Sequence, residues 1–218
     1  MNRPIWPLAA TLVIVSTLIG CVSNPINTYT ASRYYDYGFQ AERAGDLALA
    51  RQNFYRAAVN CQMGSLGPAQ EASCVYEWSR ITGYLGMYAD AEKGFNDVLT
   101  LIDKAKGKAD TLRTPTLCEL ARLLHDTDQH AKAIPVYEKA LAKLEKTTAE
   151  KDDPIAFAEF LNDFSGSLRS ADSATLADIL AQRATAIREQ NKGLTANFSA
   201  RRYKAGLIGS ADAASPRP

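Results

Sequence analysis

Residues 133–141 read AIPVYEKAL, and the spacing inside this stretch decides the fold. Ala133 is followed by an aromatic residue four positions later and by another small residue three positions after that. This spacing keeps all three side chains on one face of an α-helix. The same pattern of a small, an aromatic and a small or branched residue occurs twice upstream, at Ala50-Phe54-Ala57 and at Ala91-Phe95-Val98.

The pattern recurs at a nearly constant distance. Its first small residues are Ala50, Ala91, Ala133 and, in a weaker fourth copy without the aromatic residue, Ala177; they lie 41, 42 and 44 residues apart. Twelve residues before each stands another small residue: Gly38, Ser79, Ala121 and Ser165. A fixed period of this length indicates a helical repeat array, in which each unit buries its apolar face only by stacking on its neighbours.

The repeats resemble the tetratricopeptide repeat (TPR), in its longer variety of the kinesin-light-chain type. The resemblance implies an all-α, TPR-like right-handed superhelix of about four antiparallel helix pairs over residues 31–192. Gln62, Asp103 and Glu145 stand where the family carries a proline, so the resemblance is incomplete. Residues 193–208 are predicted to be either a capping helix or a frayed tail, and residues 209–218 a disordered tail.

The N-terminus has the features of a secretory signal peptide. Arg3 precedes an uncharged stretch from Ile5 to Gly20. Leu18-Ile19-Gly20-Cys21 resembles the lipobox of bacterial lipoproteins, which implies a signal peptide over 1–20, lipidation (palmitate among the acyl chains) of Cys21, and a linker over 21–30. An uncleaved membrane helix is the alternative, but the residues after Cys21 are too polar for a bilayer interior. Val22 after the cysteine implies the outer membrane under enterobacteria-like sorting.

Composition and motifs exclude several function classes. The formal net charge is +1 and the basic residues are scattered, so no nucleic-acid partner is expected. No phosphate-binding loop or nucleophile–base motif occurs, so we expect no catalytic residue and no enzyme activity. The two histidines, His125 and His130, should diverge on a helix, and we expect no metal site and no cofactor.

The remaining cysteines allow one disulfide. Cys61 and Cys74 are predicted at neighbouring helix ends, and an oxidising compartment permits a bond between them. Two buried free thiols are an equal alternative. Cys118 is left as a packed or groove-lining thiol.

The family resemblance implies a concave groove that is lined by the first helix of each pair. Tyrosine and arginine are enriched at protein-binding hot spots, and arginine can hold a peptide carboxylate through two hydrogen bonds. A solvated surface with helix-stabilising charges is the alternative. The groove residues expected by register are Tyr35, Phe39, Arg43, Tyr76, Arg80, Tyr84, Cys118, Arg122, His125, Asn162 and Arg169.

These expectations combine into one functional prediction. The sequence favours a scaffold or adaptor lipoprotein that binds other envelope proteins or peptides through its concave groove. It is expected in the bacterial cell envelope, lipid-anchored at the periplasmic face of the outer membrane. A permanent structural subunit of a large envelope complex is the alternative, and an enzyme is disfavoured.

Overall fold

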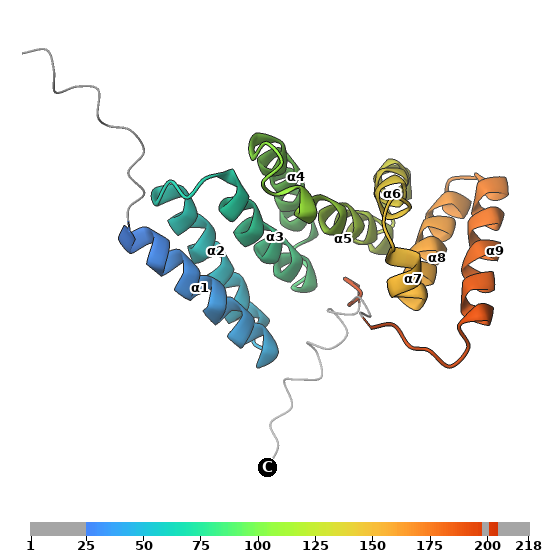
Figure 1. Cartoon of the computed structure of the whole chain (residues 1–218), viewed down its shortest axis with the longest axis horizontal. Helices are drawn as coiled ribbons and strands as arrows, with labels where there is room; N and C mark the ends of the chain where they lie inside the picture. Colours follow the sequence, from blue (N-terminus) through green and yellow to red (C-terminus); the bar gives the residue numbers. More distant parts are fainter. Residues whose placement is uncertain (1–24, 198–200, 205–218) are drawn as a thin grey trace, which may run out of the picture.

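The structure, a computed structural model, describes residues 25–197 and 201–204 (Figure 1). The signal peptide and Cys21 therefore lie outside the described residues. The elements follow in the order α1 (Pro25–Arg43), α2 (Leu47–Met63), α3 (Pro68–Tyr84), α4 (Tyr88–Lys104), the 3-10 turn η1 (Asp110–Leu112), α5 (Arg113–Asp126), α6 (His130–Leu144), α7 (Ala149–Asp152), α8 (Pro154–Ser170) and α9 (Ala174–Gln190). Within these ranges there is no β-strand.

The long helices form four antiparallel pairs: α1–α2, α3–α4, α5–α6 and α8–α9. The second helix of each pair packs against the first helix of the next, so α2 contacts α3, α4 contacts α5 and α6 contacts α8. Figure 1 shows the pairs arranged one after another along the long axis of the molecule. The predicted fold class, an all-α superhelix of TPR-like helix pairs, is confirmed.

The residues that the repeat spacing predicts as core are the residues buried in the structure. Ala50, Ala91, Ala133 and Ala177 are all completely buried. The aromatic residues four positions later, Phe54, Phe95 and Tyr137, are also buried, and so are the small residues twelve positions before. Every position that the repeat predicts as core therefore contacts a neighbouring helix, which is what a stacked array requires.

Close approach of helices explains the small residues. A Cβ atom on Gly38 would lie 2.7 Å from Cδ1 of Phe54, so only glycine leaves room for this ring. Between pairs, aromatic rings interlock instead: Tyr137 of α6 stacks on Phe164 of α8 with ring centroids 5.1 Å apart. Such aromatic pairs stabilise a core by roughly 0.5–1.5 kcal/mol beyond their buried area.

The helix ends follow from local sequence. Pro68 and Pro154 are the first residues of α3 and α8, where a missing amide hydrogen costs no helical hydrogen bond. Asp153 caps α8 by accepting a hydrogen bond from the amide of Ala156. Gly45 and Gly86 adopt φ values of +81° and +80° in the turns within pairs, a conformation that favours glycine.

The structure corrects two boundaries. Residues 25–30, predicted as linker, belong to α1, because Pro25 fits the first turn of a helix and Ala31 packs against α2 and α3. The connection 146–153, whose charged and polar residues are typical of an exposed loop, contains the single-turn helix α7. Ala149 of that turn packs against the core.

The predicted capping helix over 193–208 is not present in the described part of that segment. Residues 193–197 and 201–204 are irregular, and Gly193 adopts a φ of +89° just after α9. Instead of covering α9, the chain turns back across the array, and Tyr203 becomes completely buried against α3 and α5. The outer face of α9 keeps Leu176 and Ile179 exposed. The predicted tail 209–218 lies outside the described residues.

Candidate protein-binding groove

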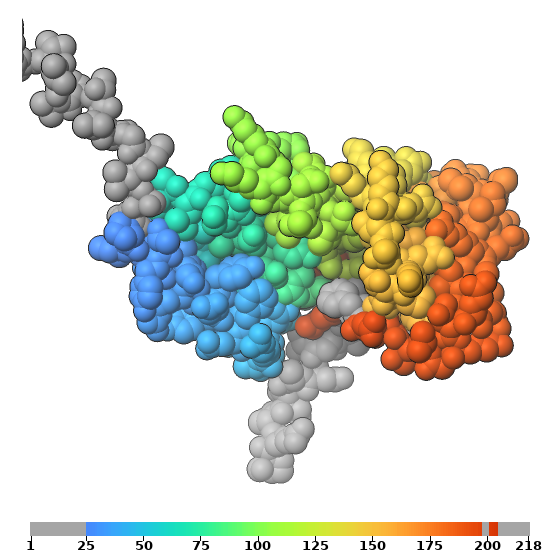
Figure 2. Space-filling view, in the orientation of Figure 1, coloured from blue at the N-terminus to red at the C-terminus, as the bar shows by residue number. Residues whose placement is uncertain are grey.

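The first helices of the pairs, α1, α3, α5 and α8, line one side of the array, and residues 201–204 lie on that side. In Figure 1 this segment, in dark red, lies between the end of α3 and the α7–α8 region. Figure 2 shows it lying between the two halves of the molecule. We call this surface, with the residues named below, the groove.

A socket for one aromatic ring forms the centre of the groove. The ring of Tyr203 stacks on Tyr84 at a centroid distance of 5.0 Å. Below it lies Gly83, whose missing side chain makes space: a Cβ there would lie 2.7 Å from Cδ1 of Tyr203 and nearer still to Cε1. The Tyr203 hydroxyl donates a 2.6 Å hydrogen bond to the buried carboxylate of Glu119. Burial raises the pKa of the Tyr203 phenol well above 10, so the hydroxyl stays a donor.

The main chain and the flanking basic side chains of the segment are also bound. The amide of Tyr203 donates a 2.8 Å hydrogen bond to Asp126, and its carbonyl accepts one of 3.3 Å from the Tyr88 hydroxyl. The Arg202 guanidinium bridges the carboxylates of Asp126 in α5 and Asp163 in α8. Lys204 pairs with Asp128 at 2.6 Å. The segment is thus held in the way that peptide-binding proteins hold a peptide: through the main chain, one ring and two cations.

An acidic residue recurs in each first helix, two positions before the small core residue. The sequence interpretation missed this series, although its spacing equals that of the repeat: Asp36, Glu77, Glu119 and Asp163. It becomes more buried toward the middle, with side-chain exposures of 13% for Glu77 and 5% for Glu119. Burial raises the pKa of the Glu77 carboxyl, and the nearby Arg80 opposes this.

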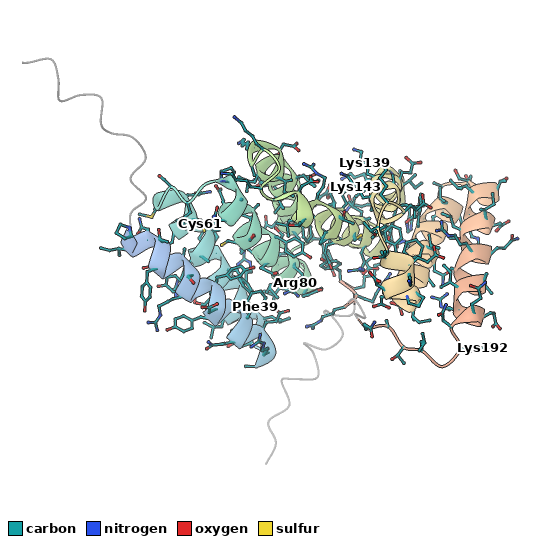
Figure 3. All side chains as sticks on the ribbon, in the orientation of Figure 1. Phe39, Cys61, Arg80, Lys139, Lys143 and Lys192 are labelled. Atoms are coloured by element: carbon teal, nitrogen blue, oxygen red, sulfur yellow. The ribbon has the colours of Figure 1, made fainter. Side chains whose placement is uncertain are left out.

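The groove arginines already have intramolecular partners. Arg80 binds both carboxylate oxygens of Glu42, at 2.6 and 2.7 Å, and also contacts Glu77 (Figure 3). Arg122 pairs with Glu119 at 2.9 Å. These side chains were expected to receive the carboxylates of a peptide. Most of the donors of Arg80 are used within the chain, whereas Arg122 makes one hydrogen bond, to Glu119, and also lines the hollow described below. Around segment 201–204, the carboxylates of Glu119, Asp126, Asp128 and Asp163 stand against the guanidinium of Arg122, so this part of the groove has an excess of negative charge.

The predicted groove residues of α1 serve mainly the core. The rings of Tyr35 and Phe39 pack edge-on against Phe54 at 5.7 and 5.1 Å. Burial raises the pKa of the Tyr35 phenol. Arg43 is exposed at the end of α1. The predicted face of α1 is therefore largely covered at the first pair.

The groove continues past Arg202 into an open hollow of about 340 Å³. Cys118, Arg122 and Phe160 line it, and it adjoins a more apolar hollow near Tyr76 and Phe157. The Tyr137 hydroxyl also borders it, and although this side chain is buried, the hydroxyl has no hydrogen-bond partner among the described residues. Burial raises the pKa of the Cys118 thiol to about 12, so this cysteine is an unreactive wall residue.

The side chains of the two histidines lie together, contrary to the prediction that they diverge. Because the α5–α6 turn reverses the chain between them, the rings of His125 and His130 meet with centroids 5.4 Å apart instead of diverging. His125 hydrogen-bonds Ser167 at 2.9 Å, and burial lowers the pKa of its imidazole. Within the described ranges, no group of three or more His, Cys, Asp and Glu side chains is placed to hold a metal ion.

The two predicted groove residues of α8 do not join the centre. Arg169 pairs with Asp178 of α9 at 2.9 Å, on the exposed α8–α9 surface. Asn162, with its amide oxygen turned toward Arg188, accepts a 3.0 Å hydrogen bond there and borders the hollow. The α8 residue that contacts segment 201–204 is Asp163, one position further along, which pairs with Arg202.

Cys61 and Cys74 are neighbours, as predicted from their helix ends. Their sulfur atoms lie 3.4 Å apart without a bond, and both side chains are buried. The hydrogen bond between them lowers the pKa of Cys61 and raises that of Cys74. A small movement of either side chain brings the pair to bonding distance.

Across 25–197 and 201–204, none of the helices has the length and apolar character to cross a bilayer.

Comparison with known proteins extends the fold assignment. No protein-family model and no curated protein sequence matches the chain. Among solved structures, BtubC (BKLC) from P. vanneervenii is similar with a TM-score of 0.67 and 17% identity, covering 80% of this chain and 69% of that one. A kinesin light chain with nearly identical TPR-like repeats from Podosopora anserina is similar with a TM-score of 0.57 and 14% identity, covering 75% and 77%. At these identities the likeness concerns the fold alone: the chain has a TPR-like repeat fold.

Proposed function

We propose that this chain is a membrane-anchored scaffold lipoprotein that binds partner proteins of the bacterial cell envelope in its groove. TPR-like arrays present an extended concave surface, and this architecture supports protein–protein interaction in general. The observation that carries the proposal is the binding of residues 201–204: the groove holds this irregular segment through its main chain, an aromatic ring and charged side chains.

The anchoring part of the proposal is supported by the lipobox-like residues Leu18 to Cys21 behind an uncharged, apolar stretch. A thiol is a strong nucleophile and suits acyl or diacylglyceryl transfer. Two or more acyl chains are needed for a stable membrane anchor. We place the protein at the periplasmic face of the outer membrane because Val22 follows the cysteine.

The anchoring test is metabolic labelling with radioactive palmitate in the bacterial host. The wild-type chain should incorporate label and co-sediment with outer membranes, whereas Cys21→Ser should lose both. Cys118→Ser is the matched control and should be labelled as wild type. Equal labelling of the wild-type chain and the Cys21→Ser chain would contradict the proposed anchor.

The scaffold test is photocrosslinking in intact cells. A photoreactive phenylalanine analogue replaces either Tyr76, which borders the groove, or Tyr55, which is 57% exposed on α2. The Tyr76 position should crosslink a defined envelope protein that the Tyr55 position does not. The same products from both positions, or none from Tyr76, would contradict a role for the groove.

A permanent structural subunit is a second candidate, because α9 ends the described helix pairs with Leu176 and Ile179 exposed at 42% and 56%. Exposed apolar residues at the end of an array are suited to a constant contact. Under this alternative, the chain made without Cys21 and without partners should aggregate. A scaffold with exchangeable partners should remain a well-behaved monomer or dimer.

A further inference from the structure

The residues that bind segment 201–204 form a site with definite chemical preferences. The carboxylates of Glu119, Asp126, Asp128 and Asp163 contact it, with the Arg122 guanidinium beside Glu119, while Arg201, Arg202 and Lys204 bring three positive charges. The socket between Gly83 and Tyr84 fits one aromatic ring, and Glu119 at its end accepts a hydrogen bond from a phenol. The site therefore selects a basic segment with one aromatic residue at its centre.

The carboxylates depend on this occupant. Asp126 is only 6% exposed, and across the site it contacts the Arg202 guanidinium and the Tyr203 amide. Glu119, 4% exposed, is shared between Arg122 and the Tyr203 hydroxyl. A buried carboxylate without partners is costly, so the empty site has a strong tendency to take up cationic and hydrogen-bond-donating groups.

The four residues leave part of the groove unfilled. The hollow of about 340 Å³ beside Arg202 is open, and the buried Tyr137 hydroxyl on its wall lacks a partner among the described residues. A longer segment that occupies the socket and also reaches this hollow gains contacts that residues 201–204 do not make. Such extra contacts allow an external ligand to compete with a tethered one, whose effective concentration is in the millimolar range.

We propose that the groove is a recognition site for a partner's Arg-aromatic-Lys segment and that residues 201–204 occupy it as a competing internal ligand. This inference rests on the groove-binding part of the proposed function and is independent of the lipid anchor. A partner binds when its segment replaces Tyr203 in the socket. The segment of another copy of this chain is the competing occupant that the test must distinguish.

The test uses the full chain in detergent and a fluorescent peptide Ser-Ala-Arg-Arg-Tyr-Lys-Ala, which has the sequence of residues 199–205. Tyr203→Ala in the chain empties the socket and should tighten peptide binding by roughly tenfold or more over wild type, because the internal competitor is lost. Adding Gly83→Ala to this variant fills the socket floor and should abolish binding. A peptide with alanine in place of the tyrosine should not bind either chain.

Three results would overturn the proposal: equal peptide affinity for wild type and Tyr203→Ala, undiminished binding after Gly83→Ala, or a wild-type dimer in which the segments are exchanged between copies. A second measurement covers the case in which Tyr203→Ala fails to fold. Excess peptide added to the wild-type chain should accelerate hydrogen exchange at the Tyr203 amide, and unchanged exchange at saturating peptide refutes displacement. A crosslinked partner in cells without peptide binding in vitro would reject this ligand class while leaving the scaffold function intact.

Discussion

A single methyl group on α3 should release residues 201–204 from the groove. In Gly83→Ala the new Cβ would lie 2.7 Å from Cδ1 of Tyr203 and nearer still to Cε1, while its contact to Cβ of Ala91 is an ordinary 3.4 Å. The helix itself gains, because alanine is favoured over glycine in a helix interior by about 1 kcal/mol. Because segment 201–204 can leave the groove, we expect the Tyr203 ring to move rather than α3.

The size of the expected effect depends on the free energy by which docking stabilises residues 201–204 in the groove. Burying a large apolar side chain stabilises by about 1.5–3 kcal/mol, and each hydrogen bond to a carboxylate adds about 1.5–3 kcal/mol. Ordering the four residues costs about 1–2 kcal/mol each. With the two hydrogen bonds of Tyr203 to carboxylates and about 0–1 kcal/mol for each ion pair of Arg202 and Lys204, docking is favourable by about 1.4–2.8 kcal/mol, which corresponds to a roughly 10- to 100-fold protection of the segment.

Limited trypsin digestion measures this protection, because the bond after Arg202 lies in the docked segment. We expect cleavage there to accelerate roughly 10- to 100-fold in Gly83→Ala, with the free energy of unfolding changed by less than about 2 kcal/mol. Gly166→Ala in α8 is the matched control, since its new Cβ meets only the end of the His125 ring, at 3.1 Å. If the Gly83→Ala chain is cleaved by trypsin as slowly as the wild type, Tyr203 does not pack against Gly83 of α3 and the reasoning is refuted.

Three further predictions concern the array. Phe95→Ala should lower the free energy of unfolding by about 3–5 kcal/mol in urea titrations, because this completely buried ring leaves a cavity between stacked pairs; a loss below about 1 kcal/mol would argue against the stack. In an oxidising compartment Cys61 and Cys74 should join, seen as a mass decrease of two hydrogens on non-reducing analysis and about 3 kcal/mol of stability lost on reduction; persistent free thiols would count against export. The pKa of His125 is lowered by burial in the folded chain, so the unfolded chain binds the proton first as pH falls, and stability should decrease below about pH 6.5 and level off below the folded pKa; urea midpoints from pH 8 to 5 should fall less in His125→Gln.

The repeat core was predictable because its signal is local and periodic. Ala91 and Phe95 lie on one helix turn, and the same spacing recurs about 42 residues away, so both the helix and its stacking partner are encoded by short-range pattern. The helix pairs and the core positions were therefore correct, while α1 begins at Pro25 rather than at residue 31.

The centre of the groove was not predictable in the same way. Tyr203 contacts Glu119 and Asp126, which lie 84 and 77 residues away in the sequence, and no periodicity connects a single irregular segment with its socket. The series from Asp36 to Asp163 was visible at the repeat spacing, but it was overlooked because the register argument counted only small and aromatic residues.

The charge of the groove could not be predicted without the structure. Arginines on a predicted concave face suggested acidic partners, yet Arg80 and Arg122 are paired with Glu42, Glu77 and Glu119. Sequence alone does not tell whether a charge is free or already neutralised by a residue of the neighbouring helix. This pairing is the reason why the proposed partner segment is basic rather than acidic.

The most direct test of this account is nuclear magnetic resonance of the chain with and without the peptide of residues 199–205. We expect nuclear Overhauser contacts between the Tyr203 ring and the Gly83 α-protons in the free chain, and their loss as labelled peptide gains the same contacts. Absence of these contacts in the free chain, or their persistence when peptide is fully bound, would contradict a groove that exchanges its own segment for a partner's.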